Sequence, residues 1–278
     1  QTGSSSDNVS IGRWGNLNQN RYFEGEIDEV RLWDVSRTQQ EIRDNMCSSL
    51  SGNEPGLRAY WNFNSGSGNT LTDNSQNNYD GTLNNMTNSN WVFSGAPIGD
   101  TSTHTYSANL STTTTILNTG VGDELTVDNI NSSADGVHIY KVDTLPNDTS
   151  GIGSPLDNYY GVFLTDISGT FDVSYHYSWH GCTNCDQIHT RNDNADTSWQ
   201  LITTPPVNCE FNLSNQSTVG YDYRAEFIID TSPLLTLSNF LGTDTTICQG
   251  DSFDLSASFP GVTYLWQDNS TDSTFTVT

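Results

Sequence analysis

The stretch "GTFDVSYHYS", residues 169–178, alternates strictly between apolar and polar side chains. A period of two is typical of a β-strand that buries one face. One face carries Phe171, Val173, Tyr175 and Tyr177, and the other carries Asp172, Ser174, His176 and Ser178. We therefore expect a strand with its aromatic face in the core of a β-sandwich.

Further strand-like runs lie on both sides of this stretch. They are "GDELTVDNI" (122–130), "GVHIYKVD" (136–143), "NYYGVFLTD" (158–166) and "RAEFIID" (224–230). Turn-forming residues separate them, as in an antiparallel sandwich. Residues 100–242 are thus predicted to form a complete β-sandwich domain.

The composition of the chain supports a mostly-β protein and excludes two classes of partner. Of 278 residues, 33 are Asp or Glu and 9 are Lys or Arg, which gives a formal charge of −24. Such a charge repels nucleic acid and anionic membranes. No stretch approaches 18 apolar residues, so we expect no membrane insertion. The chain has no basic-then-apolar leader at Gln1, and we expect it to be a processed or excised piece of a longer protein.

A capped helix and several short strands are expected before residue 100. Thr38 with Glu41 three residues later forms a capping-box pattern, and Ile42 and Met46 would share one helix face. The expected strands are "IDEVRLW" (27–33), "LRAYWNF" (57–63), "GTLNN" (81–85) and "NWVF" (90–93). Gly, Asn and Ser turns separate the strands that follow the helix.

The order of these motifs carries a resemblance. "YFEGEIDEVRLWDVSRTQQEIRDNM" (22–46), "GLRAYWNFNSGSGNTLTDNSQNNYDGTL" (56–83) and "WVFSGAPIGD" (91–100) together resemble the C-terminal half of a laminin-G-like, concanavalin A-like jelly roll of bacterial secreted proteins. A fainter likeness is to pentraxins. The resemblance implies that residues 1–99 are an incomplete domain whose other strands lie upstream.

Two weaker resemblances complete the expected architecture. Residues 100–242 are similar to a β-module that accompanies laminin-G-like domains in surface proteins of Bacteroidetes-type bacteria. Residues 243–278 resemble the early strands of an immunoglobulin-like domain, with Cys248 on its second strand and Trp266 buried on its third. The partner of Cys248 would then lie outside the chain. The predicted fold class is all-β, with β-sandwich modules in series and one short α-helix.

The segment Glu26-Ile27-Asp28 resembles the start of the acid pair of laminarinase-type glycoside hydrolases. A retaining mechanism needs two carboxyl groups about 5 to 5.5 Å apart. Val30 and Arg31 stand where the second acid would be, and Glu29 points to the opposite face of a regular strand. We therefore predict no catalytic residues and no enzyme activity in this chain.

The same segment also has a structural interpretation. If Ile27, Val30 and Leu32 all face the core, a β-bulge near residues 28–29 restores the alternation. Arg31 would then pair with a neighbouring acid on the surface, a contact of little energetic worth.

Calcium is the metal that the acidic side chains favour. The loop "TDNSQNNYDG" offers carboxylate and amide oxygens, which are calcium ligands. The candidate ligands are Asp73, Asn78 and Asp80 of this loop, together with Asp28. The alternative is an ordinary Asx-rich turn with no metal.

Three cysteines invite competing interpretations. Cys182 and Cys185 form a CxxC motif, and Cys209 lies further along the chain. In an oxidising compartment these cysteines form a disulfide of unknown pairing. The alternatives are a zinc site completed by His180 or His189, and free thiols. Cys47 has no assignment.

The aromatic side chains before residue 100 have two possible roles. They would either pack in the core or stack on sugar rings in a lectin-like groove. They are Trp14, Tyr22, Trp33, Trp61 and Tyr79.

The resemblance implies an extracellular, non-catalytic binding or adhesion region of a secreted or cell-surface bacterial protein. Its expected ligand is a glycan or a surface protein, with calcium as the expected cofactor. The alternatives are a structural spacer, and an accessory region of a polysaccharide-degrading enzyme whose catalytic domain lies elsewhere.

Overall fold

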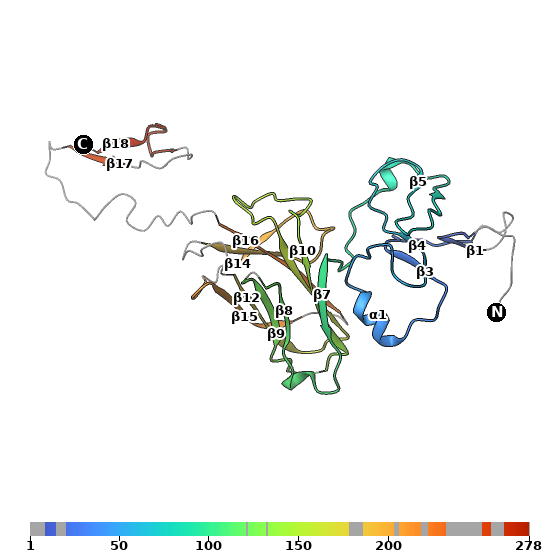
Figure 1. The fold of residues 1–278 in the computed structure, drawn as a ribbon. Coiled ribbons are helices and arrows are strands. Elements are labelled where there is room, and N and C mark those ends of the chain that lie inside the picture. The colour runs from blue at the N-terminus through green and yellow to red at the C-terminus, as the bar shows by residue number, and fades with distance from the viewer. Residues whose placement is uncertain are drawn as a thin grey trace. The chain divides into compact units, whose positions relative to one another are not determined.

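The computed structural model describes residues 9–14, 21–120, 122–131, 133–177, 186–202, 206–217, 222–231, 252–256 and 264–277. The chain divides into two compact units, residues 1–232 and 233–278 (Figure 1). β-Strands are the main regular secondary structure of the described residues, which contain one α-helix, and this confirms the predicted all-β fold class.

The centre of the first unit is a sandwich of two antiparallel sheets (Figure 1). The larger sheet has the strand order β14-β13-β16-β11-β10-β7 and the smaller one β15-β12-β9-β8. The strands of the larger sheet are β7 (Thr101–Thr105), β10 (Gly136–Val142), β11 (Tyr159–Thr165), β13 (Gln187–Arg191), β14 (Gln200–Ile202) and β16 (Tyr223–Asp230). Those of the smaller sheet are β8 (Thr115–Asn118), β9 (Glu124–Asp128), β12 (Thr170–His176) and β15 (Glu210–Ser217).

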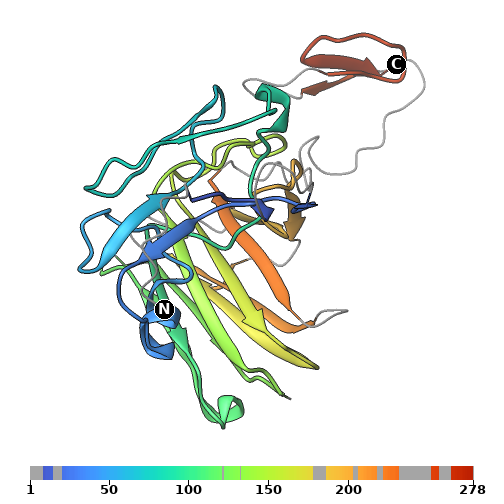
Figure 2. The ribbon, with the colours of Figure 1, turned by 90° about the vertical axis from the view of Figure 1, so that its right-hand side faces the viewer.

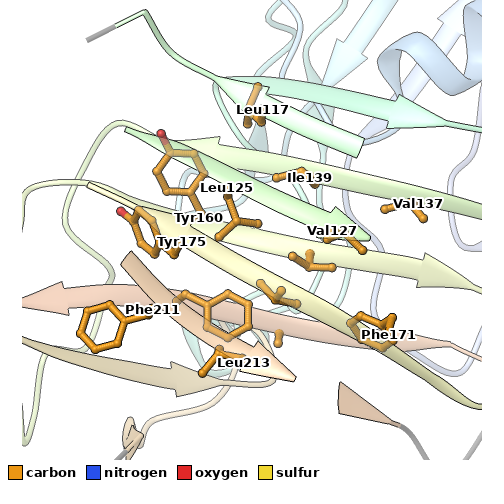
Figure 3. Packing of buried hydrophobic residues seen from close by; sticks show 14 of the residues in the cluster. Leu117, Leu125, Val127, Val137, Ile139, Tyr160, Phe171, Tyr175, Phe211 and Leu213 are labelled. Carbon is orange, nitrogen blue, oxygen red and sulfur yellow. The ribbon is translucent and has the colours of Figure 1, made fainter. Parts of the chain in front are cut away.

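The core between the sheets contains the aromatic face that the alternation predicts. Phe171, Val173 and Tyr175 of β12 are fully buried (Figure 3). The ring of Tyr175 meets that of Tyr160 edge to face, with 5.0 Å between centroids. Each such side chain contributes roughly 1.5–3 kcal/mol by leaving water, so this strand anchors the smaller sheet to the larger one.

The outer face of the larger sheet is buried as well. His138 and Tyr140 of β10 and Phe163 of β11 point away from the sandwich core, yet all three are buried. The ring of Tyr140 fills the space that a side chain on Gly161 would need. Residues that follow helix α1 and the segment 143–158 cover this face, so β10 and β11 are buried on both sides.

The segment before residue 100 consists of short strands around one helix (Figure 2). Its elements are β1 (Arg13–Trp14), β2 (Arg21–Tyr22), β3 (Val30–Trp33), α1 (Gln39–Asn45), β4 (Leu57–Trp61), β5 (Thr70–Leu71), β6 (Gly81–Thr82) and the 3-10 helix η1 (Asn88–Asn90). The pairs β1–β2, β3–β4 and β5–β6 are antiparallel. Ala59, Trp61 and Leu71 form a small core of their own.

Two strand predictions in this segment need correction. Residues 90–93 form no strand, because reciprocal hydrogen bonds between Thr87 and Asn90 fold the chain into η1. The strand expected over residues 81–85 ends at Thr82, where the side chain of Asn84 turns back and donates to the Thr82 carbonyl.

Helix α1 begins as predicted. The Thr38 hydroxyl accepts from the Glu41 backbone N–H, and the Glu41 carboxylate accepts from the Thr38 N–H at 2.7 Å. Ile42 and Met46, predicted to share one helix face, both line the same groove, but Ile42 is 55% exposed. Met46 alone packs on the sheet, because the helix has only seven residues and meets the sheet near its C-terminal end.

The second unit shows one antiparallel hairpin in its described residues, β17 (Phe253–Ser256) paired with β18 (Thr274–Val277). Trp266 lies in no strand there and is only half-buried. Its ring stacks on Phe275 at 5.1 Å, and its indole N–H donates to the Asp272 carbonyl. Cys248 lies outside the described residues.

Candidate functional site

The acids around β3 do not form a pair on one strand. Glu26 is exposed and precedes β3, whereas Glu29 has a left-handed backbone with a φ of 52°. The Asp28 carboxylate accepts a hydrogen bond from the Glu29 N–H. The Glu29 carboxylate accepts from the Tyr60 hydroxyl at 2.7 Å and from Arg31 at 2.6 Å. Glu29 therefore serves to hold Arg31 in place.

Arg31 is not the surface residue that the sequence suggested. Its side chain is only 13% exposed, and its guanidinium donates to the backbone carbonyls of Asn45 and Ser48 at 2.6 and 2.7 Å. A cation at the C-terminal end of a helix satisfies carbonyls that have no partner within the helix. Arg31 thus fixes the end of α1 to β3.

Residues 28–29, where a β-bulge was predicted, precede β3, and the core pattern also differs from the prediction. Val30 packs against the small core, whereas Leu32 is 42% exposed. A register irregularity lies between Leu32 and Trp33. The two-residue alternation is therefore interrupted after Leu32, a position that the sequence did not single out.

Asp73 is the centre of the loop that was predicted to bind calcium. The side chain is 4% exposed and accepts backbone N–H groups from Tyr60, Ser75 and Tyr79 at 2.7–2.8 Å. Burial raises the pKa of this carboxyl, but these donors outweigh burial and hold the pKa below its ordinary value. This geometry is that of the Asx-rich turn that the sequence left open.

The other predicted calcium ligands are distributed around the loop. Asp80 accepts the Asp73 N–H at 2.9 Å, Asn78 has a left-handed backbone, and Asp28 lies beside β3. In the part of the chain that the structure describes, no three His, Cys, Asp or Glu side chains are grouped as metal ligands. Calcium binding stays a prediction.

The cysteine predictions fall largely outside the described residues. Cys182, Cys185 and His180 lie there, and Cys209 directly precedes β15. His189 lies on β13 with its Nε2 atom 3.5 Å from an Asp230 carboxylate oxygen. The disulfide and zinc alternatives stay open. Cys47 is a free thiol, fully buried against Tyr140 and Phe163.

The aromatics proposed for sugar stacking have different surroundings. Trp61 is buried in the small core, Trp33 is covered by the Arg37 guanidinium at 4.1 Å, and Tyr22 and Tyr79 are more than half exposed. Trp14 ends β1. Within the part of the chain that the structure describes, the two grooves beside α1 are lined by none of these aromatic residues.

No sequence pattern predicted the groove at the C-terminal end of β7. Two open grooves of about 710 and 600 Å³ are both lined by Arg43, Tyr106 and Asp135. Residues 107–111, which include the first two residues of the 3-10 helix η2 (Leu110–Thr112), and residues 133–134 complete the larger one. Arg43 of α1 lies over the Tyr106 ring, 3.6 Å from its centre.

Two histidines lie under this groove. The register of β7 and β10 sets His104 directly opposite His138, and their rings stack with 5.3 Å between centroids. Tyr106 Oη lies 2.9 Å from His138 Nε2. The groove thus combines a guanidinium, a carboxylate, and hydroxyl and amide groups, and the buried His138 contacts the Tyr106 hydroxyl at its wall.

No family model, curated protein or solved structure matches this chain. The laminin-G-like and immunoglobulin-like resemblances therefore stay predictions. Among the described residues, no helix is both long enough and apolar enough to cross a membrane.

Proposed function

We propose that this chain is a non-catalytic binding region of an extracellular protein and that it binds a carbohydrate in the groove beside α1 and η2. The observation that carries the proposal is the lining of the groove. Arg43 and Asp135 contribute opposite charges, and the remaining polar side chains are hydroxyls and an amide. They are Ser107, Asn109, Ser111 and Ser133.

This lining suits a ligand rich in hydroxyl groups. Sugar hydroxyls both donate and accept hydrogen bonds, and they match side chains that do the same. The Ser107, Asn109, Ser111 and Ser133 side chains are exposed and already have one hydrogen-bond partner each within the protein. An apolar ligand would displace water from their remaining donor and acceptor positions without replacing its hydrogen bonds. The formal charge of −24 disfavours a polyanionic ligand. A neutral oligosaccharide is therefore the proposed ligand class.

The test is titration of the whole chain with neutral oligosaccharides from a glycan array, followed by calorimetry. Asp135→Asn and Asn109→Ala should weaken binding at least fivefold. Asp272→Asn is the matched control, because it makes the same charge change in the second unit. No binding to any neutral glycan by the wild-type chain, or equal weakening by Asp272→Asn, would overturn the proposal.

Calcium dependence is a separate part of the proposal, carried over from the resemblance. The same titrations in excess calcium and in chelator test it. Equal affinity in both would remove calcium from the proposal and leave carbohydrate binding in place.

A further inference from the structure

Helix α1 is held to the sheet by polar and charged side chains along the helix and by apolar side chains that directly follow it. Gln40 Nε2 lies 3.3 Å from His104 Nε2, and Asp44 Oδ1 lies 3.7 Å from the same atom. Arg43 covers Tyr106, which in turn contacts His138. Met46 and Cys47 continue the contact into the apolar cluster on the outer sheet face.

His138 occupies a position where a charge is costly. Its side chain is fully buried, and its Nδ1 atom has no hydrogen-bond partner in the described structure. If Nε2 accepts from the Tyr106 hydroxyl, the proton of the neutral ring lies on Nδ1. A second proton would place a cation between His104 and Arg43, and the contacts of this ring with His104, Tyr106 and Phe163 include no carboxylate.

From these contacts we propose that the stacked pair His104–His138 is a pH-sensitive latch that holds α1 on the sheet at neutral pH and releases it in mild acid. Because α1 supplies Arg43 to the groove, release also removes one groove wall. That consequence for ligand binding rests on the proposed function, whereas the release of the helix does not.

The charged groups around the two histidines do not cancel the cost of a second proton on His138. The acids are Asp44 on α1, Asp135 at the groove and Glu29 beside β3, and the cations are Arg43, Arg31 and Arg224. Asp44 Oδ1 lies 3.7 Å from His104 Nε2. Glu29 is already paired with Arg31. A protonated His104 adds positive charge 5.3 Å from the His138 ring, so the first proton makes the second more costly.

The direction of the pH effect follows from the pKa of His138. Burial first, and then the positive charge of His104 and Arg43, lowers this pKa from 6.5 to about 4. Once α1 has moved away, the ring takes up a proton near its ordinary pKa of about 6.5. The latch is therefore at full strength above about pH 6.5 and weakens as the pH falls toward 4. At pH 5 the opening equilibrium should exceed that at pH 8 by on the order of 30-fold.

Cys47 reports the opening directly. It follows α1, is fully buried and is a free thiol. The experiment measures labelling of Cys47 in the whole ligand-free chain by dithiodipyridine, which reacts in mild acid, between pH 8 and pH 5. Peptide mass spectrometry reads Cys47 separately from the other cysteines, and the rate in denatured chain at each pH corrects for intrinsic reactivity.

In the wild type, the labelling rate of Cys47, corrected for intrinsic reactivity, should be on the order of 30-fold higher at pH 5 than at pH 8. His138→Gln, which cannot ionise, should abolish the rise, and the control His176→Gln on the smaller sheet should retain it. If His138→Gln instead makes Cys47 reactive at every pH, the His104→Gln variant provides the test. Loss of the stacked ring must then reduce the rise in the Cys47 labelling rate between pH 8 and pH 5. A flat wild-type profile, or a rise that neither variant changes, would overturn the latch. Either result is independent of sugar binding, since no ligand is present.

Discussion

The ion pair between Arg191 and Glu226 is the most consequential contact on the outer face of the larger sheet. Arg191 Nε donates to Glu226 Oε2 at 2.6 Å, and the two side chains are 0% and 2% exposed. The Tyr140 hydroxyl donates to the other carboxylate oxygen at 3.0 Å. The Arg191 guanidinium also lies over the Trp199 ring at 4.4 Å. Removal of either charge therefore leaves the other buried without its partner.

Arg191→Met should lower the free energy of unfolding of the first unit by about 3–5 kcal/mol, as for other broken buried ion pairs. For a unit of this size, about 2–4 °C of melting temperature is lost per kcal/mol. The expected decrease is thus roughly 6–20 °C. Burial raises the pKa of Glu226 even with Arg191 and Tyr140 beside it, which shows how costly the lone carboxylate would be.

The assay is calorimetric unfolding of Arg191→Met, Glu226→Leu and the double variant. The double variant should be more stable than the sum of the two single effects predicts, by about 2 kcal/mol or more, because it leaves no lone charge. Arg58→Met is the control, since the Arg58–Asp34 pair is 3.7 Å apart and about half exposed, and such a pair contributes about 0–1 kcal/mol. Additive effects, or a cost for Arg191→Met as small as for Arg58→Met, would refute the argument.

Three further predictions follow from local geometry. Thr38→Ala removes the side-chain cap of α1 and should cost about 1 kcal/mol in chemical denaturation. Gly161→Ala forces a methyl group into the Tyr140 ring and should cost about 1–3 kcal/mol in the same assay. Mass spectrometry of unreduced peptides should find a disulfide among Cys182, Cys185 and Cys209, and three unlinked thiols would contradict the predicted disulfide.

The sandwich core could be predicted because its signal is local. Alternation along β12 decides which side chains are buried, and the structure confirms Phe171, Val173 and Tyr175. The capping box at Thr38 is equally local, since both of its hydrogen bonds span three residues. Such features depend on the chain within a few positions, which a single sequence displays in full.

The candidate site could not be predicted because it depends on register and on distant segments. His104 faces His138 only in the observed pairing of β7 with β10. Shifting that pairing by one residue would move one ring to the other face of the sheet. Arg43 reaches the same place from a helix more than 60 residues earlier in the chain. The sequence contains each of these residues but no local pattern that brings them together.

The outer face of the larger sheet carries two polar clusters that should respond differently to acid. Burial raises the pKa of Glu226 above its ordinary value, so the stability of the fold does not fall through this carboxyl as the pH is lowered. Burial lowers the pKa of His138 to about 4, so acid works against the packing of this ring. Tyr140 lies between them, donating to Glu226 and packing its ring against Cys47. Release of α1 should therefore stop at Tyr140, and the sandwich stays folded while the helix moves. Acid would then open the groove without unfolding the domain that carries it.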